Sequence, residues 1–429
     1  MRILYLVHQY LPRHRAGTEV YTHSLAKALA ARHEVLVYCR EPAMDGGAAP
    51  AADDVLEGVP VRRVAAHTAG RAPATPWGRF RDAYRNPRIA ADLAATLERF
   101  RPDILHIQHL KDLTVDAPAM ARAAGIPVVY TLHDYWGVCP NAQYVRPGGG
   151  ICHGPHLWLE CGRCAAYGLG MPWLTPAAPA MIPLFAERQR RIDRGIGAVD
   201  LFVAPSRFLR DRYAAGGFPA ERIRLLENGL DVTRLGEPPP RRPGAPRRYA
   251  FIGSLAWQKG VHVAVEAFRT LGDTGAELRV WGGEHVFPDY AARLRRLAEG
   301  CPWIRLEGEL HSNRVGEALA WADYLIVPSV WWENSPVTIR EAYHCGVPVI
   351  ASRLGALEEK VPEGVGGLLF RPGDPADLAR VIRRTLEDAD LLATLRANLP
   401  RVETIDEHGE RVEALYAELL EGRRARPRA

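Results

Sequence analysis

The sequence lacks any long hydrophobic run. The apolar stretch at the N-terminus, Ile3 to Val7, reaches His8 and Gln9 and is too short for a secretory signal peptide. No later run approaches the roughly 20 apolar residues that a membrane-spanning helix needs. We therefore expect a cytoplasmic protein, and a peripheral contact at the inner membrane face stays open.

Lysine is scarce as well. Of the 55 basic residues only four are lysines, Lys27, Lys111, Lys259 and Lys360, and the others are arginines. Coding bias is the simplest cause, but it makes each remaining lysine worth examining. The net charge of +5 is small for 429 residues, and the basic residues are scattered rather than gathered in a tail. The sequence therefore gives little support for nucleic-acid binding.

Strands and helices alternate in two series along the chain, whose length indicates two domains. In the first series the expected strands are 2–7, 34–38, 103–107, 126–132 and 201–204, and the expected helices are 18–32, one after Asp112 and one at Pro205. In the second series the expected strands are 249–252, 277–281, 303–306, 324–327 and 347–351, with helices over 261–271 and 290–299. Strand–helix–strand order means parallel pairing, so the fold class is α/β, with two Rossmann-like doubly wound sheets.

A proline- and arginine-rich segment separates the two series. Gly236 to Arg248 contains five prolines and four arginines, which is typical of a loop or linker. Just before it, 223–228 is able either to close the first sheet or to open the second. A last helix, 407–420, is expected to pack back on the first domain.

Two glutamates eight positions apart bracket a predicted helix start. The segment runs Glu333-Asn334-Ser335-Pro336-Val337 and reaches Glu341, and Gly346-Val347-Pro348-Val349 follows it. We expect Ser335 to cap the helix and Pro336 to occupy its first position, so that free N–H groups and the positive dipole end face the loop of Glu333. A helix N-terminus suits a phosphate and carboxylates suit vicinal hydroxyls, so the segment predicts a nucleotide-sugar site.

A glycine-containing loop lies upstream. Gly253-Ser254-Leu255-Ala256-Trp257-Gln258-Lys259-Gly260 follows a predicted strand and opens a helix, where backbone N–H groups and Lys259 are able to hold a diphosphate. Alone this pattern is weak, because an ordinary surface loop with a solvated lysine looks the same.

Taken in order, these segments resemble the retaining glycosyltransferases of the GT-B type, family 4. The resemblance covers nearly the whole chain, and the two glutamates with Lys259-Gly260 upstream are its most specific part. The matching segments are Ala16-Gly17-Thr18-Glu19, Thr131-Leu132-His133-Asp134-Tyr135-Trp136, Pro205-Ser206, Asn228-Gly229-Leu230-Asp231, Lys259-Gly260 and the Glu333–Glu341 segment. Partly on this basis we place the domain boundary near Glu227, giving an acceptor-side domain 1–227 joined by the helix 406–429, and a nucleotide-sugar-binding domain 228–405.

The resemblance implies a role for each matching position. Glu341 would bind the ribose hydroxyls, Glu333 the donor-sugar hydroxyls and Lys259 the diphosphate. His133 would sit beside the transferred sugar, and Gly17 would let the backbone approach the leaving phosphate. The predicted catalytic residues are His133, Glu333 and Lys259, and the predicted donor-binding residues are Gly17, Ser254, Lys259, Asn334, Ser335, Pro336, Val337 and Glu341. Retaining transfer, in which the leaving diphosphate accepts the acceptor's proton, requires no divalent cation.

One position departs from the family pattern. The family usually has an arginine directly after the glycine of the phosphate loop, and this chain has Ser254. The missing guanidinium removes a charged hydrogen bond worth about 1.5–3 kcal/mol. Either another arginine substitutes, with Arg340 and Arg207 as candidates, or turnover is weaker.

Four of the seven cysteines lie in one insertion of the first domain. Cys139, Cys152, Cys161 and Cys164 are expected on a strandless loop rich in proline and glycine. Four thiols in a reducing compartment suit a structural zinc ion, with His153 and His156 as alternative ligands, although buried free thiols account for the spacing equally well. A redox or iron–sulfur role is a third reading.

Aromatic and basic residues also mix over 77–88, which suits an anionic membrane surface or a solvated helix with a core-facing aromatic side. The function that fits best is transfer of a sugar from a nucleotide-sugar donor to a glycan, lipid-linked or polysaccharide acceptor. A nucleotide-sugar epimerase and a non-catalytic sugar-nucleotide-binding module are the alternatives.

Overall fold

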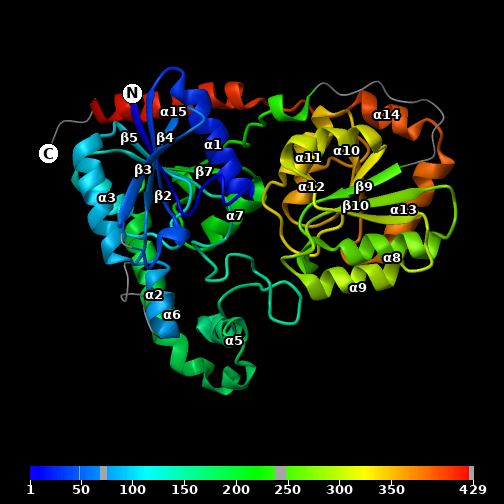
Figure 1. Cartoon of the computed structure of the whole chain (residues 1–429), viewed down its shortest axis with the longest axis horizontal. Coiled ribbons are helices and arrows are strands. Elements are labelled where there is room, and N and C mark those ends of the chain that lie inside the picture. The colour runs from blue at the N-terminus through cyan, green and yellow to red at the C-terminus, as the bar shows by residue number, and fades with distance from the viewer. Residues whose placement is uncertain (48, 68–74, 237–247, 425–429) are drawn as a thin grey trace. The chain divides into compact units, whose positions relative to one another are not determined.

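The computed structural model describes residues 1–47, 49–67, 75–236 and 248–424. Its contacts divide the chain into a first domain of residues 1–148, 152–229 and 405–429, and a second domain of residues 149–151 and 230–404. Most of the predicted proline-rich linker, 237–247, lies outside the described residues. The two domains are described separately below (Figure 1).

The first domain is built on a sheet in which all neighbouring strands are parallel except β3 and β4. The order is β3-β4-β2-β1-β5-β6-β7-β8. Its strands are β1 Arg2–Val7, β2 Glu34–Arg40, β3 Ala51–Leu56, β4 Val59–Val64, β5 Ile104–Ile107, β6 Val128–Thr131, β7 Leu201–Ala204 and β8 Ile223–Leu225. Because β8 pairs with β7, the segment 223–228 closes the first sheet.

Helices cover this sheet, and the C-terminal helix is one of them. α15 (Ile405–Arg424) lies against α1 (Gly17–Ala30) (Figure 1), and Val412 and Tyr416 are buried in the same core as Ile3 and Tyr5. The Tyr5 and Tyr416 hydroxyls hydrogen-bond at 3.1 Å. The other helices are α2 Pro76–Asp82, α3 Pro87–Phe100, α4 Ala117–Ala123, α5 Leu159–Gly168, α6 Ile182–Ile196 and α7 Arg207–Ala215.

The second domain has a parallel sheet in the order β11-β10-β9-β12-β13-β14. Its strands are β9 Arg248–Ile252, β10 Glu277–Trp281, β11 Ile304–Gly308, β12 Tyr324–Val327, β13 Val349–Ser352 and β14 Gly367–Phe370. Alternate side chains face opposite sides of a strand, so Tyr249 enters one core and Ala250 the other. Both faces are therefore covered, as a parallel sheet requires.

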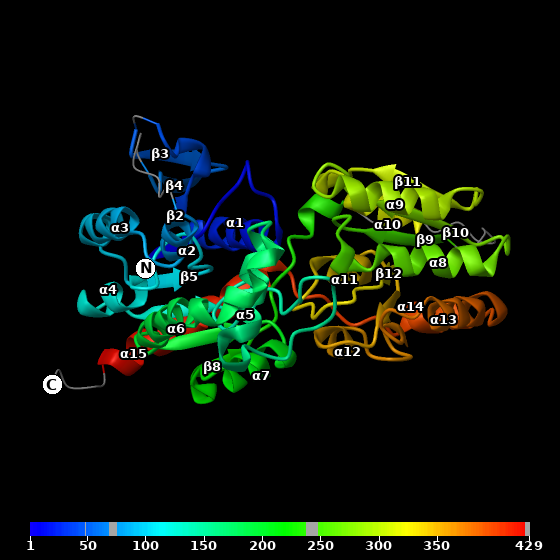
Figure 2. The same cartoon turned by 90° about the horizontal axis from the view of Figure 1, so that it is seen from below.

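The helices of this domain flank the two cores (Figure 2). They are α8 Val261–Leu271, α9 Pro288–Ala298, α10 Val315–Trp321, α11 Val337–His344, α12 Ala356–Lys360, α13 Pro375–Glu387 and α14 Leu391–Ala397. No helix in the described ranges combines the length and apolar composition that crossing a membrane requires. The fold is the expected pair of doubly wound α/β domains.

Candidate active site

In the second domain Lys259 and Glu333 meet where the strand order reverses. β9 and β12 are parallel neighbours, and β10 lies on the other side of β9, so the loops after β9 and β12 diverge at this point of the sheet. The loops are joined by the Val330 N–H, which donates to the Gln258 carbonyl at 2.9 Å. Ligands of doubly wound sheets bind at such points.

The Glu333 carboxylate is held by three donors. Its Oε1 accepts hydrogen bonds from Lys259 Nζ at 2.8 Å, Ser329 Oγ at 2.7 Å and Trp331 Nε1 at 2.9 Å. The ammonium of Lys259 also lies 5.4 Å from the centre of the Trp331 ring. Glu333 is buried, whereas Lys259 keeps about a quarter of its side chain exposed, 28%. A fixed carboxylate therefore stands beside a partly accessible cation.

Gly260 makes this approach of the two loops possible. Its φ of +68° is left-handed, and a Cβ there would lie 1.8 Å from the Pro328 carbonyl oxygen. Only glycine fits a backbone so close to another. Gly260 also directly precedes α8, so it fixes where Lys259 leaves the loop.

The start of α11 differs from the prediction. The helix begins at Val337 and its N-cap is Pro336, not Ser335. Ser335 stands one residue too early to cap, and its buried hydroxyl has no hydrogen-bond partner among the described residues. Proline has no side-chain acceptor, so no side chain caps the helix. The first-turn N–H groups therefore remain a suitable anion site.

Glu341 lies on α11 and is buried against Arg234. The guanidinium of Arg234 forms an ion pair with Glu341 Oε1, and it also donates to the Ser312 carbonyl at 3.3 Å. Both side chains are largely buried, with 17% of Arg234 and 5% of Glu341 exposed. This pairing was not predicted, because the two residues are 107 positions apart in the chain.

The two arginines considered as substitutes for the arginine missing at Ser254 belong to different domains. Ser254 is exposed in the loop after β9. Arg340 is buried on α11 of the same domain, directly before Glu341, whereas Arg207 begins α7 of the first domain. Arg340 is the candidate that shares a domain with the phosphate loop.

In the first domain His133 follows β6 and contacts one side chain from the loop after β5 and one from α1. Its Nε2 donates to Gln108 Oε1 at 2.7 Å, and its ring meets that of Tyr21 edge to face at 5.0 Å. Burial, followed by the charge of His109, lowers the pKa of His133 to about 3. His133 is therefore neutral near pH 7. Gly17 is the exposed first residue of α1, on the connection after β1.

A second set of hydrogen-bonded polar groups follows β5 and β6, as His133 does. His109 Nδ1 accepts from the Lys111 N–H at 2.9 Å, so Nε2 carries the proton that it donates to Asp134 at 2.9 Å. Burial opposes ionisation of Asp134, but His109 and the Trp136 N–H outweigh it and lower its pKa. These residues and Gln108 were not predicted as site residues, although all of them follow β5 or β6.

Glu19 is a buried carboxylate in the first turn of α1. It is 1% exposed, and neither carboxylate oxygen accepts a hydrogen bond from the described residues. His8 Nε2 lies 3.5 Å from Glu19 Oε1, and burial lowers the pKa of His8 far below its usual value. A neutral His8 provides no positive charge beside Glu19, and Glu19 lies in the first turn of α1, at the positive end of the helix dipole.

The aromatic and basic segment 77–88 packs its aromatic side inward. Phe80 meets Phe185 of α6 at 5.2 Å, and Tyr84 is 1% exposed. Trp77 is the aromatic residue that stays exposed. The arrangement is that of a solvated helix with a core-facing side.

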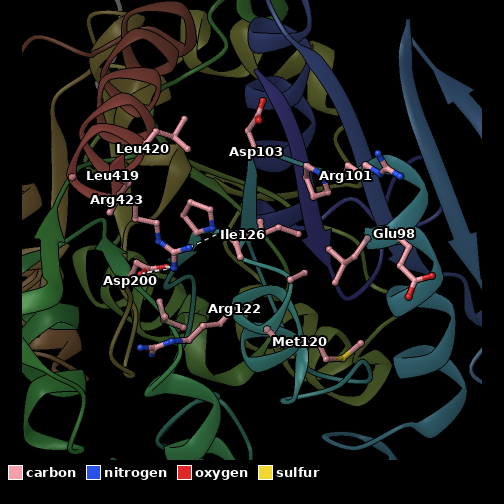
Figure 3. Close-up of a pocket in the computed structure, with 18 of the residues that line it drawn as sticks. Glu98, Arg101, Asp103, Met120, Arg122, Ile126, Asp200, Leu419, Leu420 and Arg423 are labelled. Atoms are coloured by element: carbon pink, nitrogen blue, oxygen red, sulfur yellow. Dashed lines mark hydrogen bonds and ion pairs between the residues drawn. The ribbon is translucent and has the colours of Figure 1, made fainter. Parts of the chain in front are cut away.

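A large hollow of about 1990 Å³ lies at the amino ends of the strands of the first sheet, opposite to the end at which His133 follows β6 (Figure 3). It is lined by residues that precede β5, β6 and β7 and by the end of α15. Arg423 there binds Asp200 at 3.1 Å and the Gly125 carbonyl at 2.9 Å. Arg423 and Asp200 are paired with each other, and the hollow faces the amino ends of the strands. We therefore do not assign the catalytic chemistry to this hollow.

The chain contains an Asp-x-Asp triplet, a pattern able to bind a metal ion, at Asp388-Ala389-Asp390. It lies between α13 and α14, where Asp388 Oδ1 accepts the N–H groups of Asp390 and Leu391 at 3.2 and 3.1 Å. The triplet therefore shapes a turn.

Comparison with known proteins identifies the class to which these domains belong. Residues 15–234 match the model of "Glycosyltransferase Family 4", and residues 246–388 match "Glycosyl transferases group 1". The chain belongs to glycosyltransferase family 4, and it is a glycosyltransferase with the GT-B fold.

Relatives and solved structures agree with this assignment. The chain is 27% identical over 398 residues to a glycogen synthase of Mycobacterium tuberculosis (strain ATCC 25618 / H37Rv), covering 90% of this chain and 86% of the relative. It is 28% identical to D-inositol 3-phosphate glycosyltransferase 1 of Catenulispora acidiphila, covering 87% and 84%. Sucrose-phosphate synthase from Thermosynechococcus elongatus has a TM-score of 0.70 at 17% identity, covering 98% and 99% of the two chains. Anabaena Alr3699/HepE in complex with UDP and glucose has 0.63 at 18%, covering 99% and 100%.

Proposed function

We propose that this glycosyltransferase moves a sugar from a nucleoside-diphosphate donor to a hydroxyl of a glycan, lipid-linked or polysaccharide acceptor, with retention of the anomeric configuration. The observation that carries the proposal is the fixed Glu333 carboxylate beside Lys259, four residues before the uncapped start of α11. This set offers acceptors for sugar hydroxyls and positive charge for a diphosphate. The relative called glycogen synthase and the solved structure in complex with UDP and glucose support a nucleotide-sugar donor.

Each residue has a proposed role. Glu341, held by Arg234, accepts hydrogen bonds from the ribose hydroxyls, and Glu333 accepts them from the transferred sugar. Lys259 and the α11 N–H groups stabilise the charge that develops on the leaving diphosphate, as preorganised groups do best. His133 contacts the transferred sugar as a neutral hydrogen-bonding group, and Gly17 leaves room beside the leaving phosphate.

The proposed step needs no protein base. The bond from the anomeric carbon to the diphosphate oxygen breaks, the acceptor oxygen bonds to that carbon on the same face, and the acceptor's proton passes to the departing diphosphate. Since Lys259 and the helix start supply the positive charge, we propose that no divalent cation is required. Turnover that survives removal of Mg²⁺ and Mn²⁺ is the expected result.

The first experiment is a thermal-shift screen against UDP, GDP, ADP and their sugars, because a ligand of the folded state raises its stability with concentration. The sugar nucleotide that binds is then incubated with acceptors, and NMR determines the anomeric configuration of the product. Glu341→Ala is compared with Glu358→Ala, an exposed glutamate of α12. Unchanged donor affinity and turnover in Glu341→Ala would refute the assignment.

Two other activities give different outcomes in the same assays. An epimerase would convert the donor without an acceptor, which NMR of the donor incubated alone detects. A non-catalytic module would bind the donor and neither hydrolyse nor transfer its sugar.

A further inference from the structure

The insertion that follows β6 contains a long segment without charge. From Cys164 to Ala186 the sequence has no aspartate, glutamate, lysine, arginine or histidine, and glycines and prolines interrupt its apolar residues. The segment forms the end of α5, the short 3-10 helix η3 (Pro172–Met181) and the start of α6, and these three elements contact one another. Figure 1 shows them extending beyond the strands of the first sheet. Their outer surface therefore lies away from the core of the domain.

The same insertion carries four cysteines, and the structure corrects the expectation that all four are on a loop. Cys161 and Cys164 lie on α5, whereas Cys139 and Cys152 lie on the segment before it. All four are reduced. The described residues contain no group of three His, Cys, Asp or Glu side chains that could hold a metal ion. The described side chains therefore give no support to the expected zinc site.

Packing holds the elements of the insertion in place. Arg188 of α6 is 2% exposed, its Nη2 donates to the Trp136 carbonyl at 2.5 Å, and its guanidinium lies 4.5 Å from the centre of the Trp136 ring. Gly162 of α5 lies so close to η3 that a Cβ there would be 2.8 Å from the Ala178 carbonyl oxygen. The side chains that the insertion exposes are therefore presented by packed elements.

Large apolar side chains are exposed on this insertion. Leu157, Tyr167 and Trp173 are 82%, 53% and 69% exposed, and Leu159 and Leu169 are 38% and 36% exposed. Single exposed apolar side chains are ordinary on a protein surface. Five of them on elements that contact one another indicate an interaction surface.

Helix α2 packs beside the insertion and carries arginines. Phe185 of α6 meets Phe80 of α2 at 5.2 Å, and it stacks with Trp158 of the insertion at 6.3 Å. Arg79 of α2 and Arg85, three residues after its end, are both exposed. Since Phe185 contacts both elements, the arginines belong to the same end of the first domain as the exposed apolar side chains.

The charge of this region is positive. Residues 76–88 and 157–194 hold nine arginines and four acidic residues, so their positive excess is as large as the net charge of +5 of the whole chain. Arg190 of α6 is exposed, and like Arg79 and Arg85 it forms no ion pair with a described residue. The uncharged surface therefore has unpaired cations beside it.

We propose that the face formed by residues 157–173, the insertion face, docks on the surface of an anionic lipid bilayer. Leu157, Tyr167 and Trp173 enter the boundary between headgroups and acyl chains, where leucine is buried and tyrosine and tryptophan are favoured. The three unpaired arginines face the negatively charged headgroups. Docking favours a lipid-linked acceptor among the classes proposed above. That consequence rests on the proposed function, whereas the docking itself does not.

A second copy of the chain is the other occupant that an apolar face suits. In a symmetric dimer the face would meet itself, so the unpaired arginines of one copy would approach those of the other. Anionic headgroups instead supply negative charge, and each arginine near the bilayer strengthens binding about fivefold. The charge of the region therefore favours the bilayer.

Sedimentation of the full chain with lipid vesicles tests the proposal. We expect binding to vesicles of phosphatidylcholine and phosphatidylglycerol, and at least about tenfold weaker binding to phosphatidylcholine alone. Binding should weaken as the salt concentration rises, because salt screens the arginines. A chain that stays in the supernatant with anionic vesicles at low salt would overturn the proposal. Neither donor nor acceptor is present, so this result is independent of the transfer assays.

Matched variants locate the docking surface. Leu157→Ser and Trp173→Ser should each lower the affinity for anionic vesicles by about tenfold, whereas Val55→Ser, at a 65% exposed position of β3, should leave it unchanged. Arg190→Gln should lower it about fivefold and reduce its salt dependence. Arg383→Gln, at an exposed position of α13 in the second domain, is the matched control.

Two outcomes would reject the insertion face as the docking surface. The first is equal vesicle binding by Leu157→Ser and Val55→Ser, with melting temperatures that show both variants to be folded. The second is a dimer, detected by analytical ultracentrifugation, that Trp173→Ser dissociates while the wild-type chain binds no vesicles. That result would assign the face to a second copy of the chain.

Discussion

Lys259 Nζ lies 2.8 Å from Glu333 Oε1, across the two loops that diverge at the switch point of the second sheet. The pair brings together a cation that attracts phosphate and a carboxylate that accepts hydrogen bonds from hydroxyls. Its geometry depends on the approach of two backbones at Gly260. Both the proposed chemistry and the stability of this domain therefore depend on the close approach of Gly260 to the Pro328 carbonyl.

Removing the ammonium should weaken transfer. Lys259→Met is expected to lower kcat/KM by about 10- to 100-fold, because a charged hydrogen bond to the diphosphate is worth about 1.5–3 kcal/mol. Lys27→Met is the control, since Lys27 is exposed on α1 and pairs with Glu57. The measurement is initial-rate kinetics with the donor found in the thermal-shift screen, and equal rates for the two variants would contradict the role.

Adding a side chain at Gly260 should destabilise the second domain. Gly260→Ala places a Cβ 1.8 Å from a backbone oxygen, whereas Gly300→Ala meets nothing within 4 Å at a similar φ of +77°. The φ strain alone costs about 1–2 kcal/mol, so Gly300→Ala should lose no more than that and Gly260→Ala clearly more. Urea unfolding measures both, and equal losses would exclude the close approach.

The Arg234–Glu341 pair should couple stability to donor binding. Removing Arg234 alone leaves a buried carboxylate, which typically costs about 3–5 kcal/mol. Arg234→Met and Glu341→Gln, singly and together, form a double-mutant cycle in which the double variant should lose less stability than the two single losses combined. We also expect Glu341→Gln to weaken nucleoside-diphosphate binding, measured by calorimetry. Additive losses of stability would show that the pair does not interact.

The first domain should lose stability in mild acid. Burial lowers the pKa of His133 to about 3, and it lowers the pKa values of His8 and His106 well below 6.5. Below pH 6.5 the unfolded chain therefore binds protons that the folded chain does not. The free energy of unfolding should fall as pH falls below about 6.5, by about 1.4 kcal/mol per pH unit for each histidine that stays neutral in the folded chain. For His133 this loss continues down to about pH 3.

Hydrogen exchange of the β1 and β5 amides, corrected for its intrinsic pH dependence, measures this slope. His106→Gln should reduce it, because His106 is fully buried between Tyr416 OH at 2.5 Å and Thr131 Oγ1 at 2.7 Å. His311→Gln, at an exposed position of the second domain, should not change it. A slope that is flat from pH 7 to 5 would contradict neutral burial of these histidines.

Replacing the exposed Ser254 by the arginine of the family pattern tests whether another guanidinium already contacts the diphosphate. Ser254→Arg should raise donor affinity by up to about 100-fold if no other guanidinium contacts the diphosphate. Exposure of Ser254 leaves room for the longer side chain. An unchanged affinity, measured by calorimetry, would indicate that Arg340 or another arginine already provides the contact.

Much of the fold was predictable because buried strands are continuous apolar runs. The predicted bounds of β1, β7, β10, β12 and α8 coincide with those observed. Strands β3 and β4 were not predicted, and β3 gave no apolar signal because it is largely exposed and carries Asp53 and Asp54. Exposed edge strands have no apolar pattern to reveal them.

Sequence order alone determined which residues follow each strand, and hence that Lys259, Glu333 and His133 are candidates. It did not determine their partners. Arg234 meets Glu341 from 107 positions away, and Ser335 fails to cap because the helix starts one residue later than expected. Local patterns encode elements, since these depend on neighbouring residues. Ion pairs and buried charges such as Arg188 depend on which elements the sheet order brings together, and only the tertiary structure decides that.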